Sequence, residues 1–281
     1  MSWTSLTNKV VLVTGGARGI GKGLAEACLR DGATVVITHL NPESGQQAEQ
    51  TLTTLGSVRA VRCDATDRTQ VDALLDDIWQ REGPLDLVFS NAGAGGTQRA
   101  LDAPIAEIHS LFATNFESAV HLAQSYVPRM QREEKPGHIM FTGSEHSVGL
   151  PAGNEDLGFV FYGATKHAML IFAEWLRADL HGTNVSTSLL MPGPVLTEGV
   201  VGTFELLDQD PDNAEVRAVF SPKVEALLRE RAISTEQCAR RALQGLREGL
   251  FYIPTQAHIQ QDVERRHNEM NRAFATMGLH S

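Results

Sequence analysis

The 281-residue sequence has few cysteines and few cations, and both shortages exclude classes of protein. Its three cysteines, Cys28, Cys63 and Cys238, are odd in number and show no C-x-x-C spacing, which argues against a disulfide framework and a zinc knuckle. We therefore expect no metal site and a reducing cytoplasm. Against 34 Asp and Glu stand 24 Lys and Arg, so the formal charge is −10. This charge repels phosphate backbones and anionic lipid, which makes nucleic acid and membrane surfaces poor candidate partners.

Long hydrophobic runs are also missing. No stretch approaches about 18 uninterrupted apolar residues, and residues 1–9 are polar with no apolar segment behind a basic start. We therefore expect neither a membrane span nor a signal peptide. Hydrophobic residues make up 42% of the chain and 25 residues are glycine, a composition typical of a globular domain with a large core. We interpret the chain as a single domain.

Short apolar runs rich in β-branched residues alternate with amphipathic stretches. Each run is short enough to be a strand, and its unbroken apolarity predicts burial on both faces of a sheet. The expected strands are residues 10–14, 34–39, 58–63, 85–90, 138–142, 185–191 and 251–253. Helical patterns lie between them, such as 42–55, which opens with Asn41 as N-cap. The sequence therefore predicts an α/β fold, a doubly wound parallel sheet with helices on both faces and ligands at the carboxyl ends of its strands.

The regular alternation stops after Pro192. A long stretch that includes the acidic residues 208–212 follows before a helical pattern resumes. It is too long for an ordinary connection, so we interpret residues 195–232 as a flap over the site. Beyond the last expected strand the chain is polar and helical in pattern, as an assembly arm or a solvated tail would be. We thus expect a catalytic domain of residues 1–255 and a C-terminal helical tail of residues 256–281.

A glycine-rich turn follows the first expected strand directly. Residues 14–21 read Thr-Gly-Gly-Ala-Arg-Gly-Ile-Gly and lead into a helix. A strand, a glycine-rich turn and a helix N-terminus together supply free backbone N–H groups and a positive dipole end for a pyrophosphate. Glycine-rich turns occur in many α/β proteins, and this spacing differs from the G-x-G-x-x-G of long-chain dehydrogenases. The position of this turn, after the first strand and before the first helix, therefore supports pyrophosphate binding more than the glycine spacing does.

Tyr162 and Lys166 are four residues apart, which places a phenol and an ammonium on one face of a helix. A tyrosine with an ordinary pKa of about 10 is a poor base at neutral pH, but a nearby cation lowers that pKa by roughly 1 to 3. The pair can therefore pass a proton. A solvated Tyr/Lys pair would show the same spacing.

Two polar residues stand at places where such a sheet binds ligands. Ser144 follows the expected strand at 138–142, so its hydroxyl can donate a hydrogen bond to a carbonyl oxygen that gains negative charge. A simple strand-end serine is the alternative. Asn115 is polar among apolar neighbours in the helical stretch 111–124 and can bind water or a backbone carbonyl. A helix-bending or core role fits that residue equally well.

Taken together, these motifs resemble the short-chain dehydrogenase/reductase family in its single-domain form. The resemblance covers about residues 5–255, and its signals occur in the family order. They are residues 14–21, Asn91-Ala92-Gly93, Asn115, Ser144, the Tyr162/Lys166 pair and Pro192-Gly193-Pro194-Val195-x-Thr197. The resemblance implies a Rossmann-like fold and an NAD(P)(H)-dependent oxidoreductase that interconverts a secondary alcohol and a ketone.

The resemblance also implies a role for each matching residue. Tyr162 is the general acid/base, and Lys166 binds the nicotinamide ribose and lowers the tyrosine pKa. Ser144 orients the substrate oxygen, and Asn115 holds a proton-relay water. The implied cofactor-binding residues are Gly15, Arg18, Gly19, Ile20, Gly21, His39, Asp64, Ala65, Asn91, Gly93, Tyr162, Lys166, Pro192, Gly193, Val195 and Thr197.

Two departures from the family pattern bear on specificity. Seventeen residues separate Ser144 from Tyr162, more than the family usually has, so the substrate wall is unusual and Ser147 is the alternative serine. The second expected strand ends in His39 rather than in an acid, which removes the repulsion that would exclude a 2′-phosphate. Arg18 can pair with that phosphate, although a solvated turn arginine is the alternative. We expect NADP(H) to be favoured, with NAD(H) as the alternative cofactor.

Apolar residues in 148–161 and in the expected flap predict a pocket for a bulky, uncharged alcohol or ketone. The resemblance implies a homodimer or homotetramer built on the helices that carry Asn115 and Tyr162. Two alternatives to the oxidoreductase are open. One is a lyase or isomerase on the same scaffold, because a fold does not fix the reaction. The other is a catalytically silent NAD(P)-binding regulator, which would have no need of Tyr162, Lys166 and Ser144.

Overall fold

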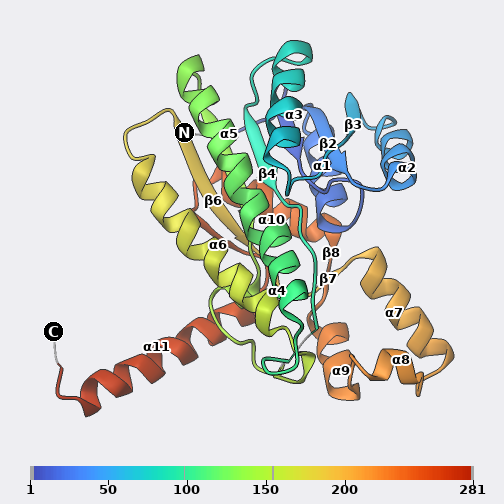
Figure 1. Ribbon diagram of the computed structural model, residues 1–281, viewed down its shortest axis with the longest axis vertical. Coiled ribbons are helices and arrows are strands. Elements are labelled where there is room, and N and C mark those ends of the chain that lie inside the picture. Colours follow the sequence, from blue (N-terminus) through green and yellow to red (C-terminus); the bar gives the residue numbers. More distant parts are fainter. Residues whose placement is uncertain (1–2, 98, 154, 280–281) are drawn as a thin grey trace.

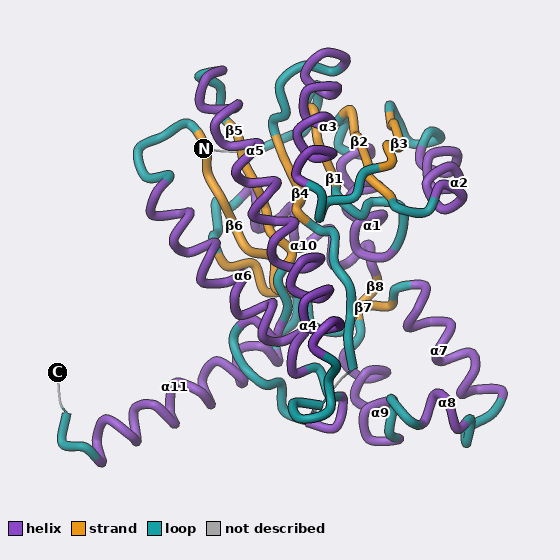
Figure 2. The backbone as a smooth tube through the Cα atoms, in the orientation of Figure 1, coloured by secondary structure: helices purple, strands orange, loops and turns teal. Residues whose placement is uncertain are grey.

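The computed structural model describes residues 3–97, 99–153 and 155–279. Within these residues, helices cover both faces of a seven-stranded sheet of order β3-β2-β1-β4-β5-β6-β9, as Figures 1 and 2 show. All six strand pairings in this sheet are parallel. The order reverses after β1, which places a ligand crevice between β1 and β4. The predicted fold, a Rossmann-like doubly wound sheet in one domain, is confirmed.

The strands begin and end within two residues of the expected positions. They are β1 (Val10–Val13), β2 (Thr34–His39), β3 (Val58–Arg62), β4 (Leu87–Ser90), β5 (Gly137–Thr142), β6 (Val185–Met191) and β9 (Tyr252–Pro254). Every residue of β4 and β5 is buried, which explains why central strands of a covered parallel sheet are unbroken apolar runs. The edge strand β3 is only partly buried and includes Arg59 and Arg62.

Twelve helical segments surround the sheet within the described residues, besides two short 3-10 turns, Glu145–Ser147 and Glu155–Leu157. They are α1 (Gly19–Arg30), α2 (Pro42–Leu52), α3 (Arg68–Arg81), α4 (Ile105–Phe112), the π-helix Ala113–Glu117, α5 (Ser118–Glu133), α6 (Val160–Asp179), α7 (Glu198–Gln209), α8 (Ala214–Arg217), α9 (Pro222–Arg231), α10 (Thr235–Arg247) and α11 (His258–Thr276). Asn41 caps α2 as expected, because its side chain accepts a hydrogen bond from the Ser44 N–H. None of the helices in the described part of the chain has the length and hydropathy that crossing a membrane requires.

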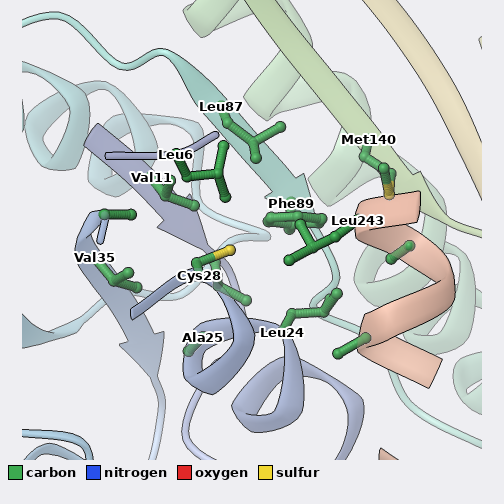
Figure 3. Close-up of a cluster of buried hydrophobic side chains, with 14 of the residues drawn as sticks. Leu6, Val11, Leu24, Ala25, Cys28, Val35, Leu87, Phe89, Met140 and Leu243 are labelled. Carbon is green, nitrogen blue, oxygen red and sulfur yellow. The ribbon is translucent and has the colours of Figure 1, made fainter. Parts of the chain in front are cut away.

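The core has one layer on each face of the sheet. On one face, α1 and α10 pack together against β1 and β4, and Figure 3 shows Leu24, Leu243 and Phe89 meeting there. On the other face, the side chains of α3, α5 and α6 pack on the sheet around the buried Tyr126. Burial of this apolar surface holds the strand ends in fixed positions, and those ends carry the site.

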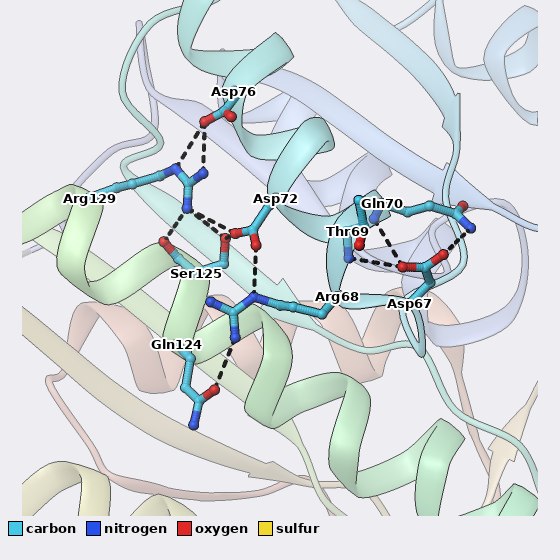
Figure 4. Close-up of polar contacts among 9 residues, drawn as sticks. All are labelled: Asp67, Arg68, Thr69, Gln70, Asp72, Asp76, Gln124, Ser125 and Arg129. Atoms are coloured by element: carbon cyan, nitrogen blue, oxygen red, sulfur yellow. Dashed lines mark hydrogen bonds and ion pairs between the residues drawn. The ribbon is translucent and has the colours of Figure 1, made fainter.

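Polar contacts join α3 to α5 outside the second core layer (Figure 4). Arg129 of α5 donates hydrogen bonds to Asp72 and Asp76 of α3, and its own neighbour Ser125 hydrogen-bonds Asp72. Asp67 caps the start of α3 by accepting from the Thr69 N–H. Single surface ion pairs contribute little, but a connected network with a mostly buried arginine fixes the relative positions of two helices.

The segment interpreted as a flap has a closed base. A short second sheet pairs β7 (Val195–Leu196) with β8 (Ile233–Ser234), so the two ends of the segment are hydrogen-bonded to each other. Between them, α7, α8 and α9 form an outlying lobe, visible beside the main body in Figure 1. A small separate core of Leu157, Phe204, Val224 and Leu228 joins this lobe to the body. The sequence pattern did not reveal these two-residue strands.

The C-terminal residues form a single helix, α11, that projects away from the body (Figure 1). Its first two turns are anchored, since Ile259 and Asp262 are buried. Farther along, Met270 and Phe274 are about half exposed, at 53% and 50%. The expected helical tail is therefore a helix with an attached beginning and an exposed end.

Candidate active site

The carboxyl ends of the parallel strands surround a cleft of about 1070 Å³. Every residue assigned to cofactor binding from the sequence lines this cleft, and so do Ser144, Tyr162 and Lys166. Asn115 lies behind the cleft wall and is 1% exposed. The fold therefore brings together residues that are far apart in the sequence, at the edge of the sheet where ligands of doubly wound folds bind.

The glycine-rich turn connects β1 to α1 along the floor of the cleft. Gly15 has φ +62, a left-handed conformation that favours glycine. A Cβ on Gly21 would lie 2.3 Å from the carbonyl oxygen of Gly15, so the turn closes only around a bare backbone. Thr14 Oγ1 accepts hydrogen bonds from the N–H groups of Asn91 and Ala92, at 2.9 and 3.0 Å, and so joins the turn to the end of β4. This is a rigid cradle that fits a dinucleotide pyrophosphate.

The carboxylate of Glu198 contacts the glycine-rich turn. The N–H of Gly19, at the start of α1, donates a 2.8 Å hydrogen bond to Oε2 of Glu198, the first residue of α7. A helix N-terminus attracts negative charge, which accounts for the contact. The same N–H is one that a pyrophosphate on this turn would use. Glu198 therefore links the outlying lobe to the phosphate turn, a contact that sequence reasoning missed.

The adenosine end of the cleft is bordered by the end of β2. His39 lies there with its ring against Gly45 of α2, and its Nδ1 is buried without a hydrogen-bond partner among the described residues. Arg18, in the glycine-rich turn, is exposed on the same cleft. Asp64 accepts hydrogen bonds from the N–H and the hydroxyl of Thr66, which fixes its carboxylate at the cleft edge. An unpartnered buried nitrogen of His39 and the exposed Arg18 on the same cleft fit a polar ligand.

Asn91 and Asn115 hold the loop that follows β4. Asn91 donates to the Thr14 carbonyl and accepts from the Thr142 hydroxyl, so it ties β1, β4 and β5 together. Asn115 Oδ1 accepts from the N–H of Ala94 at 2.7 Å, and its Nδ2 donates to the Ala94 carbonyl at 2.9 Å. The expected helical stretch at 111–124 is helical throughout, and within it α4 and α5 are joined through the π-helix that carries Asn115. The proton-relay role of Asn115 stays a prediction.

Tyr162, Lys166 and Ser144 meet at the centre of the cleft. The Lys166 ammonium donates to the Thr142 carbonyl at 2.8 Å and lies 5.5 Å from the centroid of the Tyr162 ring. The Ser144 hydroxyl hydrogen-bonds the phenol. Ser147, the alternative serine, is fully buried and accepts from the Ser144 N–H in a capping box. Ser144 is therefore the serine that meets the phenol in the cleft.

Burial dominates the acid–base properties of this group. It raises the pKa of the Tyr162 phenol, while the Ser144 hydroxyl lowers that pKa and the Glu145 carboxylate raises it. The direction of this shift is opposite to the lowering expected from Lys166, because burial is its largest cause. Burial also lowers the pKa of Lys166 to about 8, so the ammonium stays mostly charged at neutral pH.

The other end of the cleft has apolar walls with a few buried polar groups. Leu157, Phe159, Val200, Phe220 and Leu228 line it, from the segment before α6 and from the outlying lobe. In contrast, Leu150, Val160, Val201 and Leu206, expected on the same walls, are largely exposed, at 57%, 45%, 38% and 49%.

His146 packs against Tyr162 and Phe159, with ring centroids 5.7 and 5.5 Å apart. It is buried, and burial lowers the pKa of its imidazole. The imidazole is therefore part of the wall beside the phenol.

A model of the family described as short chain dehydrogenase matches residues 9–205 of this sequence. The chain belongs to the short-chain dehydrogenase family. It is accordingly an oxidoreductase that acts on CH–OH groups with a nicotinamide cofactor. The match includes the glycine-rich turn, Ser144, Tyr162, Lys166 and the start of α7, and it ends before α10.

Known proteins resemble this short-chain dehydrogenase over nearly its whole length. It is 33% identical to 1-deoxy-11-beta-hydroxypentalenate dehydrogenase of Streptomyces avermitilis, over 96% of this chain and 93% of that protein. A short-chain dehydrogenase/reductase from Burkholderia phymatum in complex with NAD has the same fold, with a TM-score of 0.83, 24% identity and 96% of each chain covered. L-Sorbose reductase from Gluconobacter frateurii, complexed with NADPH and L-sorbose, has a TM-score of 0.77 and 21% identity over 90% of this chain and 97% of that one.

Sequence reasoning missed three charged or titratable residues at the cleft of this short-chain dehydrogenase. Glu198 contacts the phosphate turn, and the buried Glu145 pairs with His258 at 2.6 Å. Their only sequence signal is a place next to a recognised motif, Glu198 after Thr197 and Glu145 after Ser144. His258, at the start of α11, carries no such signal.

Proposed function

We propose that Tyr162 transfers the proton between itself and the substrate oxygen, which Ser144 orients by hydrogen bonding. The meeting of the Ser144 hydroxyl, the phenol and the Lys166 ammonium in one cleft supports these roles. Lys166 binds the ribose, and Asn115 holds a water that relays the proton. The nicotinamide supplies or accepts the hydride when bound. The residues that would hold the cofactor all line the cleft; they are Gly15, Arg18, Gly19, Ile20, Gly21, His39, Asp64, Ala65, Asn91, Gly93, Tyr162, Lys166, Pro192, Gly193, Val195 and Thr197.

We propose NADP(H) as the preferred cofactor. His39 stands where an acid would repel a 2′-phosphate, and the exposed guanidinium of Arg18 borders the same end of the cleft. The test compares kcat/KM for NADPH and NADH in the wild type, in Arg18→Ala and in His39→Asp. Both variants should lose NADPH preference, and Arg30→Ala, at the far end of α1, is the matched arginine control. A clear NADH preference of the wild type would refute the proposal.

We propose a bulky, uncharged secondary alcohol or ketone as the substrate. The apolar lining by Leu157, Phe159 and Phe220 supports bulk, and the Glu145 carboxylate on the same cleft opposes an anionic group. Similarity to a protein named as a hydroxypentalenate dehydrogenase supports an alcohol substrate. A panel of candidate alcohols and ketones, assayed by the change in nicotinamide absorbance, tests this substrate class. Higher kcat/KM for small keto acids or phosphosugars than for alicyclic or aryl ketones contradicts it, and cofactor binding without turnover on any substrate points to a regulator.

We propose that the protein is a homodimer or homotetramer in the cytoplasm. Trp175 and Ile171 are exposed at 67% and 51% on α6, an apolar face that association through this helix would cover. Free, buried cysteines fit a reducing compartment. Light scattering should report a dimer or tetramer. The Trp175→Glu variant should weaken this association of subunits. A wild-type monomer at micromolar concentration would contradict the assembly.

We also propose that residues 195–232 act as a flap on a catalytic domain of residues 1–255, with 256–281 as a helical tail. The paired base of β7 and β8 and the separate small core of the lobe support a segment that moves as a unit.

A further inference from the structure

His146 is a buried histidine whose ring makes no hydrogen bond within the described part of the chain. It is 5% exposed, close to the 6% of His138. Both ring nitrogens of His138 are hydrogen-bonded, to the hydroxyls of Ser186 and Ser188 at 2.8 Å each. For His146, among the described residues, only the backbone N–H is hydrogen-bonded, to Ser144. Burying an imidazole without a partner costs free energy, which a ligand that supplies the partner would recover.

The imidazole of His146 lines the cleft beside the reacting groups. Its ring stands edge-on to the Tyr162 ring, with centroids 5.7 Å apart and an interplanar angle of 79°, and it packs on Phe159 at 5.5 Å. A Cβ on Gly163 would lie 3.8 Å from its Nδ1, so α6 is close on one side. These contacts hold the ring without using either nitrogen for a hydrogen bond. Both nitrogens are therefore available to a ligand in the cleft.

The main chain joins His146 to the serine that meets the phenol. The His146 N–H donates to Ser144 Oγ at 3.2 Å, at the start of the 3-10 turn Glu145–Ser147. Because this bond uses a lone pair of the hydroxyl, the Ser144 proton is available for the phenol or for a substrate oxygen. Ser144 hydrogen-bonds Tyr162 and His146 packs against it. A substrate whose reacting oxygen lies at Ser144 and Tyr162 therefore has its neighbouring atoms near His146.

The imidazole has the chemistry to bind an uncharged oxygen. Burial lowers the pKa of His146, so the ring is mostly neutral at neutral pH. A neutral imidazole has one N–H donor and one acceptor nitrogen. A hydroxyl group can bind either nitrogen, and a carbonyl oxygen can accept from the N–H. The ring therefore fits a hydroxyl or carbonyl group of an uncharged substrate.

We propose that His146 is a specificity-determining residue that hydrogen-bonds a second oxygen of the substrate, a hydroxyl or carbonyl group beside the reacting carbon. This inference rests on the proposed function, in which Tyr162 and Ser144 bind the reacting oxygen. The preferred substrates are then bulky hydroxyketones, diketones or diols instead of compounds with a single oxygen. His146 takes no part in the transfer of the proton or the hydride.

Two pairs of bulky ketones that differ in the second oxygen test this inference. Benzoin carries a hydroxyl group that deoxybenzoin lacks, and camphorquinone carries a carbonyl group that camphor lacks. The measured quantity is the ratio of kcat/KM within each pair, from the change in nicotinamide absorbance. The wild type should favour the ketone with two oxygens. His146→Leu should lower that ratio about tenfold, the order expected when a buried hydrogen bond is lost and its partner is left unpaired.

Three further variants separate hydrogen bonding from packing. His146→Phe keeps the aromatic contacts but has no ring nitrogen, so it should lose the preference too, and it covers the case in which His146→Leu does not fold. His146→Gln keeps a donor and an acceptor and should retain most of the preference. His121→Leu is the matched control, since His121 Nδ1 also lacks a partner among the described residues but His121 lies outside the cleft lining. An unchanged ratio in His146→Leu and His146→Phe would overturn the inference, and so would an equal fall in His121→Leu.

Nitrogen NMR of the histidine rings separates this inference from the proposed function, because it needs no turnover. In the complex with oxidised cofactor, which cannot reduce a ketone, camphorquinone should shift the His146 ring signals and camphor should not. The signals are assigned by their loss in His146→Gln. If Tyr162→Phe keeps its turnover, the proposed function fails, and the NMR shift still decides the role of His146. If Tyr162→Phe is inactive and neither the shift nor the kcat/KM ratio depends on His146, only the present inference fails.

Discussion

The two ends of the cleft are built in different ways. The cofactor end consists of strand ends and a turn that hydrogen-bond one another, such as Thr14 Oγ1 with the Asn91 N–H. The substrate end consists of short turns and an outlying helical lobe, joined by a small core that includes Phe204 and Val224. A shared fold needs one fixed cofactor geometry, whereas a substrate pocket changes with each reaction. The cofactor end is therefore held by the sheet, whereas the substrate end is held by a few packed side chains.

The largest effect should come from the phenol at the boundary of the two ends. Tyr162→Phe should lower kcat by about 10² to 10⁴, because general acid–base catalysis is lost, and should leave cofactor affinity nearly unchanged. Steady-state kinetics and a cofactor titration measure the two quantities. Tyr252→Phe is the control, since that hydroxyl contacts Glu174. Half of the wild-type activity in Tyr162→Phe would remove Tyr162 from the mechanism.

A methyl group at each end should sharpen the contrast in rigidity. Gly21→Ala places a Cβ 2.3 Å from the Gly15 carbonyl and should lower cofactor affinity at least about tenfold while costing roughly 1–3 kcal/mol of stability. Gly202→Ala, in α7, meets nothing within 4 Å. It should raise stability by at most about 1 kcal/mol through helix propensity. Calorimetry measures the stability of both variants, and a titration measures their cofactor affinity. Equal losses in the two variants would contradict the difference in rigidity between the two ends of the cleft.

The pH dependence of stability tests the burial of Lys166. Its pKa falls from 10.5 to about 8 on folding, so between these values the unfolded chain binds more protons than the folded chain. The free energy of unfolding should therefore rise with pH across that window, by an amount on the order of a few kcal/mol. Denaturant unfolding at pH 8 and pH 10 measures the rise. Lys166→Met should lack this contribution, and an equal rise in that variant would contradict the assignment.

The smallest effect concerns the contact that joins the two ends. Glu198→Gln removes the charge facing the Gly19 N–H and should tighten cofactor binding about two- to fivefold, the size of a charge effect at a helix end. Fluorescence titration of the cofactor measures it, most clearly at low salt. Glu205→Gln, exposed on the same helix, is the matched control. Weaker binding in Glu198→Gln would mean that Glu198 supports the cofactor instead of competing with it.

Local patterns predicted the fold and most of the cleft lining. Strands appeared as short apolar runs because both faces of the sheet are covered, and the spacing of Tyr162 and Lys166 is a property of one helix. Contacts between distant segments left no such pattern. Glu198 meets Gly19 across 179 positions, and His258 meets Glu145 across 113. The π-helix at Asn115 likewise depends on what packs around it, since periodicity within the segment is the same for a continuous helix.

The raised pKa of Tyr162 could not be predicted from sequence for a related reason. The sequence names a lysine four residues away, which lowers the pKa of a phenol, but desolvation depends on how completely other segments cover the ring. The burial of a side chain depends on all the segments that pack around it. The direction of the pKa shift of Tyr162 therefore follows only from the assembled structure.

The packing of α1 against α10 has a consequence for how the protein is made. These two helices share one core layer although most of the chain lies between them, and α10 lies beyond the residues that the family model matches. At about 5–20 residues per second, synthesis separates them by roughly tens of seconds. During that time the apolar side of α1, including Leu24 and Cys28, lacks its cover. A nascent chain that stalls before α10 should therefore expose the apolar side of α1 that α10 covers in the folded protein.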